Sequence, residues 1–201
     1  MDEGTDAPGT DRGVDPVEQA RCPAQEDLRV ALARVAVALK RSGLPFALTG
    51  GYAVWARGGP ESGHDVDFLI AQDDIEQVVE ALEEQGLEVV RPPEDWLVKV
   101  YTDGAMVDII HRHSGKPARR ETVEDADEIE VLSVQMPVLS ATELLVQKSL
   151  AMDEHYCDLS TMIPVARALR EQVDWDRVRE ETADSPFAAA LLFLLEQLDV
   201  I

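Results

Sequence analysis

The chain has 201 residues, 45% of them hydrophobic, which is enough for one domain with a substantial core. No run approaches the roughly 18 apolar residues of a membrane span, so we expect no membrane partner. The 18 basic residues face 40 acidic ones, and the net charge of −22 disfavours a protein that grips duplex nucleic acid along its length. This charge does not exclude binding of a tRNA end in a local basic groove, and it would attract a cationic small molecule. The alternative is that the acidity only confers solubility.

The N-terminal segment 1–23 is rich in Asp, Glu, Gly, Pro and Thr and has almost no large apolar side chains. We therefore expect disorder there, and the segment has no signal-peptide core. The two cysteines, Cys22 and Cys157, lie far apart without metal-ligand spacing, which favours a reduced, cytoplasmic setting.

Helices and short strands then alternate as far as residue 110. An amphipathic helix is predicted over 26–42, where apolar residues recur every three or four positions, and Gly43 with Pro45 ends it. A short buried strand at 46–49 follows. The further predicted elements are a helix from 73–74 to Gly86, strands at 87–90, 96–101 and 105–110, and a hairpin turn at 102–104.

Gly50 and Gly51 connect the strand at 46–49 to a helical stretch that begins at Tyr52. A strand that enters a glycine turn and a helix N-terminus presents free backbone N–H groups to an anion. Glycine also lets a phosphate approach the backbone closely. The pattern predicts a nucleotide-binding turn, and an ordinary tight turn is the alternative.

The strand after this turn carries two aspartates with one residue between them. Side chains i and i+2 share a face of a strand, so Asp65 and Asp67 lie on one side and Val66, Phe68 and Ile70 on the other. Two adjacent like charges cost roughly 1 kcal/mol at ~4 Å in water, and more where solvent is scarce. A divalent cation such as Mg²⁺ would compensate them, whereas a solvated strand edge is the plainer alternative.

The two halves together resemble the signature of the DNA polymerase β-like nucleotidyltransferase superfamily. That signature is an apolar-Gly-Gly turn, then the thirteen residues from Tyr52 to His64, then Asp-apolar-Asp-apolar, over about a tenth of the chain. The aromatic-Ala-Val after the glycines and the His before the first Asp are most similar to small antibiotic nucleotidyltransferases of the lincosamide and aminoglycoside types. AbiEii-type and related toxin-associated nucleotidyltransferases are also similar. Relatives often carry Thr-Arg or Ser-Arg before the aspartates, where this chain has Glu61-Ser62-Gly63-His64.

Asp108 lies inside the apolar strand predicted at 105–110. A buried carboxylate is costly unless it is paired or binds a cation. The resemblance implies that a third aspartate, on the strand beside the Asp-x-Asp strand, completes the cluster that holds two Mg²⁺ ions, with Mn²⁺ as a substitute. The alternative is a strand-end Asp that accepts hydrogen bonds from loop N–H groups.

The segment 111–120 is the one basic island in this acidic chain. It is expected either to contact triphosphate or an acceptor phosphate, or to be a flexible surface loop that offsets the acidic run 121–130. One strand or a pair of strands is predicted over 129–139.

From Ser140 the apolar spacing becomes helical. Helices are predicted at about 140–153, 158–172, 174–182 and 185–198. Ser140 with Glu143 fits a capping box, and Asp174 and Ser185 are further caps. Pro164 is expected in the first turn of the second helix, or before a later start. The last helix is apolar nearly all round from residue 187, which indicates burial in a bundle or a protein partner.

Three further side chains are weaker candidates. The resemblance implies that Lys148, on the helix after the sheet, neutralises the triphosphate, although a solvent-facing lysine is the alternative. His155 and Asp158 could pair on one helix. His64 could orient a phosphate or a water molecule, or have no special role.

We therefore expect an α+β protein with a small mixed sheet. A catalytic domain at 24–139 would carry the site, and a helical subdomain at 140–201 would close over it. The predicted reaction transfers a nucleoside monophosphate from an NTP to a hydroxyl acceptor, releasing pyrophosphate, with Asp65, Asp67 and Asp108 as metal ligands and Asp108 also as general base. The acceptor is an antibiotic-like small molecule, a tRNA end or a protein. The alternative is a non-catalytic module that acts as an antitoxin or regulatory partner.

Overall fold

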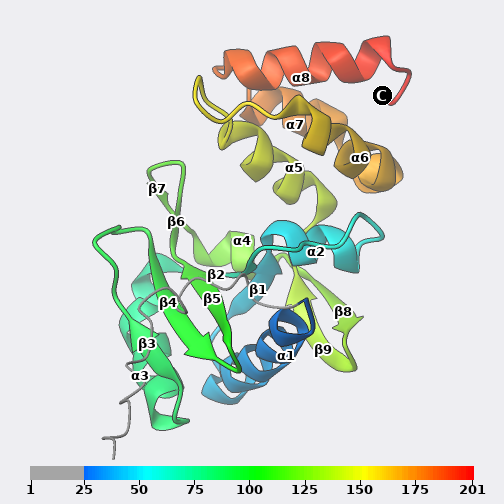
Figure 1. Cartoon of the computed structure of the whole chain (residues 1–201). Helices are drawn as coiled ribbons and strands as arrows, with labels where there is room; N and C mark the ends of the chain where they lie inside the picture. Colours follow the sequence, from blue (N-terminus) through cyan, green and yellow to red (C-terminus); the bar gives the residue numbers. More distant parts are fainter. Residues whose placement is uncertain (1–24) are drawn as a thin grey trace, which may run out of the picture.

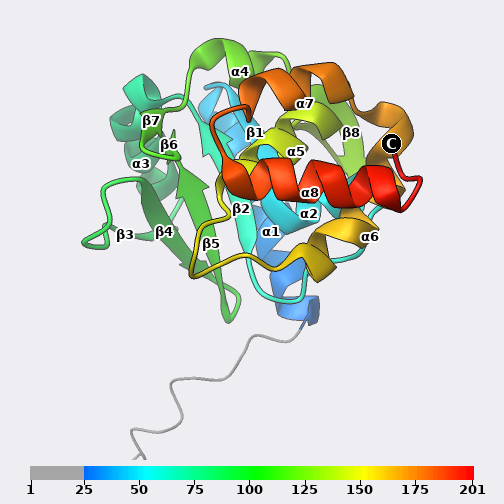
Figure 2. The ribbon, with the colours of Figure 1, turned by 90° about the horizontal axis from the view of Figure 1, so that it is seen from above.

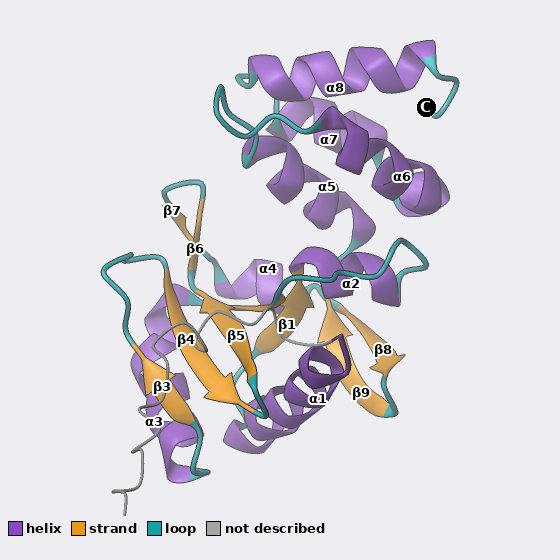
Figure 3. Cartoon of the chain, in the orientation of Figure 1, coloured by secondary structure: helices purple, strands orange, loops and turns teal. Residues whose placement is uncertain are grey.

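The fold is built on a seven-stranded mixed sheet (Figures 1 and 3). The computed structural model describes residues 25–201, so the predicted disorder of 1–23 lies outside the described residues. The strands, in the spatial order β3-β4-β5-β2-β1-β9-β8, are β1 (Phe46–Thr49), β2 (Val66–Ile70), β3 (Glu88–Val90), β4 (Leu97–Thr102), β5 (Ala105–Ile110), β8 (Asp127–Val131) and β9 (Val134–Val138). β2 runs antiparallel to β1 and parallel to β5, so the predicted α+β class with a mixed sheet is confirmed.

Helices cover the sheet and stack above it. Those of the first part are α1 (Gln25–Ser42), α2 (Gly50–Ala56), α3 (Ile75–Glu84) and α4 (Arg120–Glu124). Those of the second part are α5 (Ala141–Leu150), α6 (Leu159–Leu169), α7 (Trp175–Glu181) and α8 (Pro186–Gln197). Figure 2 shows α5 to α8 lying over the end of the sheet that carries α2. None of the helices within residues 25–201 is long and apolar enough to cross a membrane.

The first helix forms where its apolar spacing predicts it. One stripe of α1, including Leu28, Leu32 and Leu39, is completely buried and packs against α3 and the sheet. Gly43 ends the helix with a φ of +71°, which is a left-handed conformation that glycine adopts without steric cost.

The C-terminal helices begin at the predicted caps. The Ser140 hydroxyl accepts a hydrogen bond from the N–H of Glu143 at 3.2 Å. The Asp174 carboxylate accepts one from the N–H of Arg177 at 3.0 Å, and Ser185 caps α8 in the same way. Each contact satisfies an N–H that the helix itself leaves unpaired.

Polar contacts fix the helices to the sheet. Gln147 on α5 accepts a hydrogen bond from the Thr49 hydroxyl at 3.0 Å with its side-chain oxygen. Its backbone carbonyl accepts a second bond, at 3.1 Å, from Nε2 of His113. Arg57, just after α2, donates to the carbonyl of Leu139 at 2.6 Å. The ends of β1, α2 and α5 are therefore held together.

The basic island differs from the predicted loop. Part of it forms a hairpin of β6 (Arg112–His113) and β7 (Lys116–Pro117), which rises from the sheet beside α5 (Figure 1). Ser114 and Gly115 turn the hairpin with positive φ angles of 48° and 74°. A two-residue turn with this backbone matches the twist of paired strands, and the Ser-Gly dipeptide was its signal. The acidic run after the hairpin contains the short helix α4, which the pattern did not predict.

Two predictions about the second half were also wrong. Pro164 lies in the middle of α6, where its exposed position leaves the carbonyl of Ser160 to water. His155 lies in the loop before α6, whereas Asp158 caps that helix, so the two share no helix face. The predicted burial of α8 in a bundle is confirmed on one side, where Ala188, Leu191 and Leu195 are buried and the helix contacts α5 and α6, whereas the Phe193 ring is 64% exposed and a protein partner stays a prediction.

Candidate active site

Two of the predicted carboxylates are direct neighbours in the sheet. Asp67 on β2 pairs in register with Asp108 on β5, and on its other side with Thr49, the last residue of β1. Asp65 lies just before β2 and is exposed, whereas Asp108 is buried. The sheet thus holds two acids side by side, with a third two residues away on the same side.

The environment of Asp67 disfavours its negative charge. Burial, and then the charges of Asp65 and Asp108, raise the pKa of Asp67 to about 7, while Lys148 and Lys99 act in the opposite direction. Burial also raises the pKa of Asp108, against the effect of the nearby Lys99. The cluster is therefore short of positive charge, as expected for acids that bind a cation.

The glycine turn contacts the same cluster. Gly50 has a φ of +64°, and a Cβ built at this position would overlap the Oδ2 and Cγ atoms of Asp67. A Cβ at Gly51 would lie 2.6 Å from that of Ser62, in the loop before the aspartates. Both glycines are therefore required for the backbone of the turn to pass this close to the carboxylate and its loop.

Two lysines flank the acids from different elements. Nζ of Lys99, on β4, lies 3.2 Å from Oδ1 of Asp108. Lys148 comes from α5 on the other side, and its charge acts on Asp67. His64 is exposed, and no residue in the described range forms a hydrogen bond or ion pair with its ring.

The chain supplies no arginine directly before the aspartates, and Arg29 of α1 reaches this loop instead. Its guanidinium forms two hydrogen bonds of 2.7 Å with the carboxylate of Glu61. This bidentate ion pair fixes the loop that leads into β2.

The donor chemistry of the cluster fits a hard divalent cation. Its side-chain donors are carboxylate oxygens, which Mg²⁺ prefers, and Gly50 leaves an open approach beside Asp67. Within residues 25–201, no group of three or more His, Cys, Asp and Glu side chains is already arranged to hold a metal ion. Here the ammonium of Lys99 is the counter-ion of Asp108.

Sequence reasoning missed Lys99 and Gln147. The Lys99 signal was present, because the hairpin turn at Asp103 and Gly104 sets the register in which Lys99 faces Asp108. Gln147 had no such signal for its contacts with Thr49 and His113, since both residues are far away in the chain.

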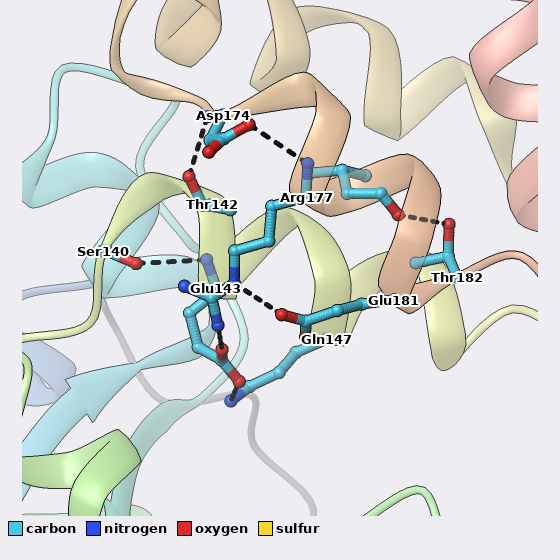
Figure 4. Close-up of polar contacts among 9 residues, drawn as sticks. Ser140, Thr142, Glu143, Gln147, Asp174, Arg177, Glu181 and Thr182 are labelled. Atoms are coloured by element: carbon cyan, nitrogen blue, oxygen red, sulfur yellow. Dashed lines mark hydrogen bonds and ion pairs between the residues drawn. The ribbon is translucent and has the colours of Figure 1, made fainter.

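A polar network beside the cluster joins α5 to α7 (Figure 4). Arg177 on α7 lies between two carboxylates, that of Glu143 at 3.1 Å and that of Glu181 at 2.5 Å. Glu143 also accepts a hydrogen bond from the side chain of Gln147 at 3.0 Å, and the N–H of Asp174 donates to the Thr142 hydroxyl at 2.9 Å. One guanidinium thus pairs with both acids of this wall and offsets one of their two negative charges.

Comparison with known proteins gives one matching family model and several similar solved structures. Residues 21–199 match the family model described as uncharacterised nucleotidyltransferase. No curated protein matches the chain.

Two similar solved structures are both of the antibiotic-resistance factor ANT(2'')-Ia. Its solution structure has a TM-score of 0.56 and 14% identity, covering 84% of this chain and 96% of that chain. Its crystal structure with adenylyl-2''-tobramycin has a TM-score of 0.54 and 13% identity, covering 81% and 95%. The lincomycin-bound lincosamide antibiotic adenylyltransferase LnuA has a TM-score of 0.48 and 14% identity, covering 76% and 100%. At these identities the ANT(2'')-Ia structures show a shared fold.

Proposed function

The chain belongs to the family of uncharacterised nucleotidyltransferases, and we propose that it transfers a nucleoside monophosphate from an NTP to a hydroxyl acceptor with Asp65, Asp67 and Asp108 as its metal ligands. The observation that carries this assignment is the in-register pair of Asp67 and Asp108 beside the Gly50 turn. The region 24–139 would carry the reaction, and the helices of 140–201 would close over it.

Each side chain of the cluster has a role in the proposal. The three carboxylates would bind Mg²⁺, or Mn²⁺ in its place. The bound ion would neutralise phosphate charge and make the acceptor hydroxyl more acidic. Backbone N–H groups of Gly50 and Gly51 would receive phosphate oxygens, and Lys148 would balance the remaining charge of the triphosphate.

Proton transfer is assigned to Asp108, which would accept the proton of the acceptor hydroxyl as its oxygen attacks the α-phosphorus. Burial raises the pKa of Asp108 above that of an ordinary aspartate and thus toward neutral pH, where a general base works best. His64, exposed directly before Asp65, is kept only as a residue that could contact the nucleotide.

The test follows labelled nucleoside monophosphate. Purified protein would be incubated with each α-labelled NTP, MgCl₂ and separate pools of aminoglycosides, tRNA, other small molecules and the protein itself. Transfer to one pool, and its loss in Asp108→Ala with an unchanged thermal unfolding curve, is expected. Wild-type turnover by Asp108→Ala would refute the mechanism, and tight nucleotide binding without turnover on any acceptor would support a non-catalytic module instead.

Two less specific expectations belong to the same proposal. The exposed Phe193 ring supports a protein partner at α8, and the free, exposed thiol of Cys157 fits a reducing cytoplasm. Sedimentation of the purified protein with and without Phe193→Ser would test the first.

A further inference from the structure

A cavity of about 770 Å³ lies beside the carboxylate cluster. Leu69 lines it, two residues from Asp67 and on the same side of β2, which places the cavity about 7 Å further along the strand. Val146 and Leu150 of α5 add apolar surface, and Lys116 of the β6–β7 hairpin adds charge. Sites for small molecules have this size and this mixture of apolar and polar lining.

The glycine turn and the cavity lie on opposite sides of Asp67. Thr49 pairs with Asp67, so the chain beyond Thr49, at Gly50, continues toward Asp65. Leu69 and the cavity lie in the other direction along β2. A nucleotide whose phosphates contact the glycine turn would therefore leave the cavity free for the second substrate.

Uncompensated positive charge distinguishes this cavity. Lys116 and Arg119 line it, and the side chain of neither forms a hydrogen bond or ion pair with any residue in the described part of the chain. The rest of the basic island is paired, since Arg112 contacts Asp95 and Arg120 contacts Asp74. These two free cations stand out in a chain of net charge −22.

The acids of the opposite wall do not cancel them. Glu143 and Glu181 line the cavity, and Arg177 pairs with both of them and offsets one of their two negative charges (Figure 4). His113, between the hairpin and α5, is buried enough to lower its pKa, so its ring is neutral near pH 7. When Arg177 is counted with the lining, three cations face two carboxylates, and this excess of one positive charge is unfavourable for a polycationic acceptor.

We propose that this cavity is the acceptor site and that the acceptor is a small hydroxyl compound with an anionic group held by Lys116 and Arg119. The inference rests on the proposed function and adds the acceptor class to it. We favour a small molecule over a tRNA end because the cavity volume suits a small molecule and because the net charge of −22 repels a polyanion more strongly than a compound with one anionic group.

The transfer is a substitution at phosphorus. The acceptor oxygen forms a bond to the α-phosphorus, and the bond between that phosphorus and the bridging oxygen breaks with its electron pair going to pyrophosphate. The hydroxyl proton passes to the carboxylate of Asp108. The anionic group of the acceptor takes no part in bond making and only fixes the hydroxyl in place.

The experiment compares acceptor pools of different charge. A small-molecule extract of the producing cells is separated by ion exchange into anionic, neutral and cationic fractions, and total tRNA forms a fourth pool. Each is incubated with the full chain, α-labelled NTPs and MgCl₂. Label in the anionic fraction is expected.

A matched pair of double variants locates the site. Lys116→Ala/Arg119→Ala should raise the KM for the anionic pool at least roughly tenfold, because both charged contacts to the anionic group are lost. Binding of a fluorescent NTP should stay within twofold. The control Arg41→Ala/Arg167→Ala removes the same charge from two other cations that pair with nothing in 25–201, and its KM should be unchanged.

The contrary outcomes are distinct. Label in the neutral, cationic or tRNA pool would refute the anionic acceptor while leaving nucleotidyl transfer intact. An equal KM for the two double variants, or weakened NTP binding in Lys116→Ala/Arg119→Ala, would refute the location. Label in no pool would refute the proposed function, and this inference with it.

Discussion

Replacing Asp67 by Asn should stabilise the metal-free protein at alkaline pH. The folded protein raises the pKa of Asp67 from 3.8 to about 7 through burial and the neighbouring acids. Between these values the folded state binds a proton that the unfolded state has already lost, so the contribution of Asp67 to stability is fully present below pH 4 and is lost as the pH rises to about 7. Asparagine has no charge to desolvate and should not show this fall.

The size of the effect follows from the pKa difference. At about 1.4 kcal/mol per pKa unit, the shift corresponds to about 4 kcal/mol, and water at the partly exposed carboxyl reduces this to about 2–4 kcal/mol. Relative to wild type, the melting temperature of Asp67→Asn at pH 8 in EDTA should therefore rise by roughly 4–16 °C.

Thermal unfolding from pH 4 to pH 8, followed by circular dichroism in EDTA, measures this difference. Asp184→Asn, an exposed aspartate in the turn before α8, is the control and should follow the wild type. Excess MgCl₂ should stabilise the wild type and leave Asp67→Asn almost unchanged. If the melting temperatures of wild type and Asp67→Asn changed with pH in the same way across this range, folding would not raise the pKa of Asp67 and the reasoning would be refuted.

Two further changes test the geometry of the cluster. Gly50→Ala should abolish transfer and lower the melting temperature, because the added Cβ overlaps Asp67 and the φ of +64° is strained for alanine. The control Gly63→Ala, with open space around it, should change neither property. Labelled transfer and a melting curve are measured for both variants. Lys99→Met removes the cation 3.2 Å from Asp108, so the rising limb of the pH profile of kcat/KM should move to higher pH by roughly one unit, and an unmoved limb would exclude Lys99 from the electrostatics of the site.

Most of the sheet and the long helices could be predicted from the sequence because local signals specify them. Leu28 and Leu39 mark the buried stripe of α1, and Ser140 and Ser185 mark helix starts with caps that form as expected. Pro164 was misplaced because tertiary packing carries α6 through a residue that local rules place at its start.

The carboxylates of the site could be predicted, but their surroundings could not. The spacing of Asp65 and Asp67 and the isolated acid at Asp108 are visible in the sequence, and the strand register then brings Asp67 and Asp108 together. The contacts of Gln147 depend on how α5 docks on the sheet, which no local pattern encodes. The metal and nucleotide roles of these residues stay predictions until the variants are measured.

The parallel ladder between β2 and β5 makes the chain unequally tolerant of changes in length. Strand register places Asp67 beside Asp108, so residues gained or lost in the linker at 91–96 should leave the two carboxylates adjacent. One residue inserted between Gly104 and Asp108 would instead turn the carboxylate of Asp108 to the reverse face of the sheet. The linker at 91–96 can therefore change in length without separating the two acids, whereas a single-codon insertion in β5 would move the carboxylate of Asp108 away from that of Asp67.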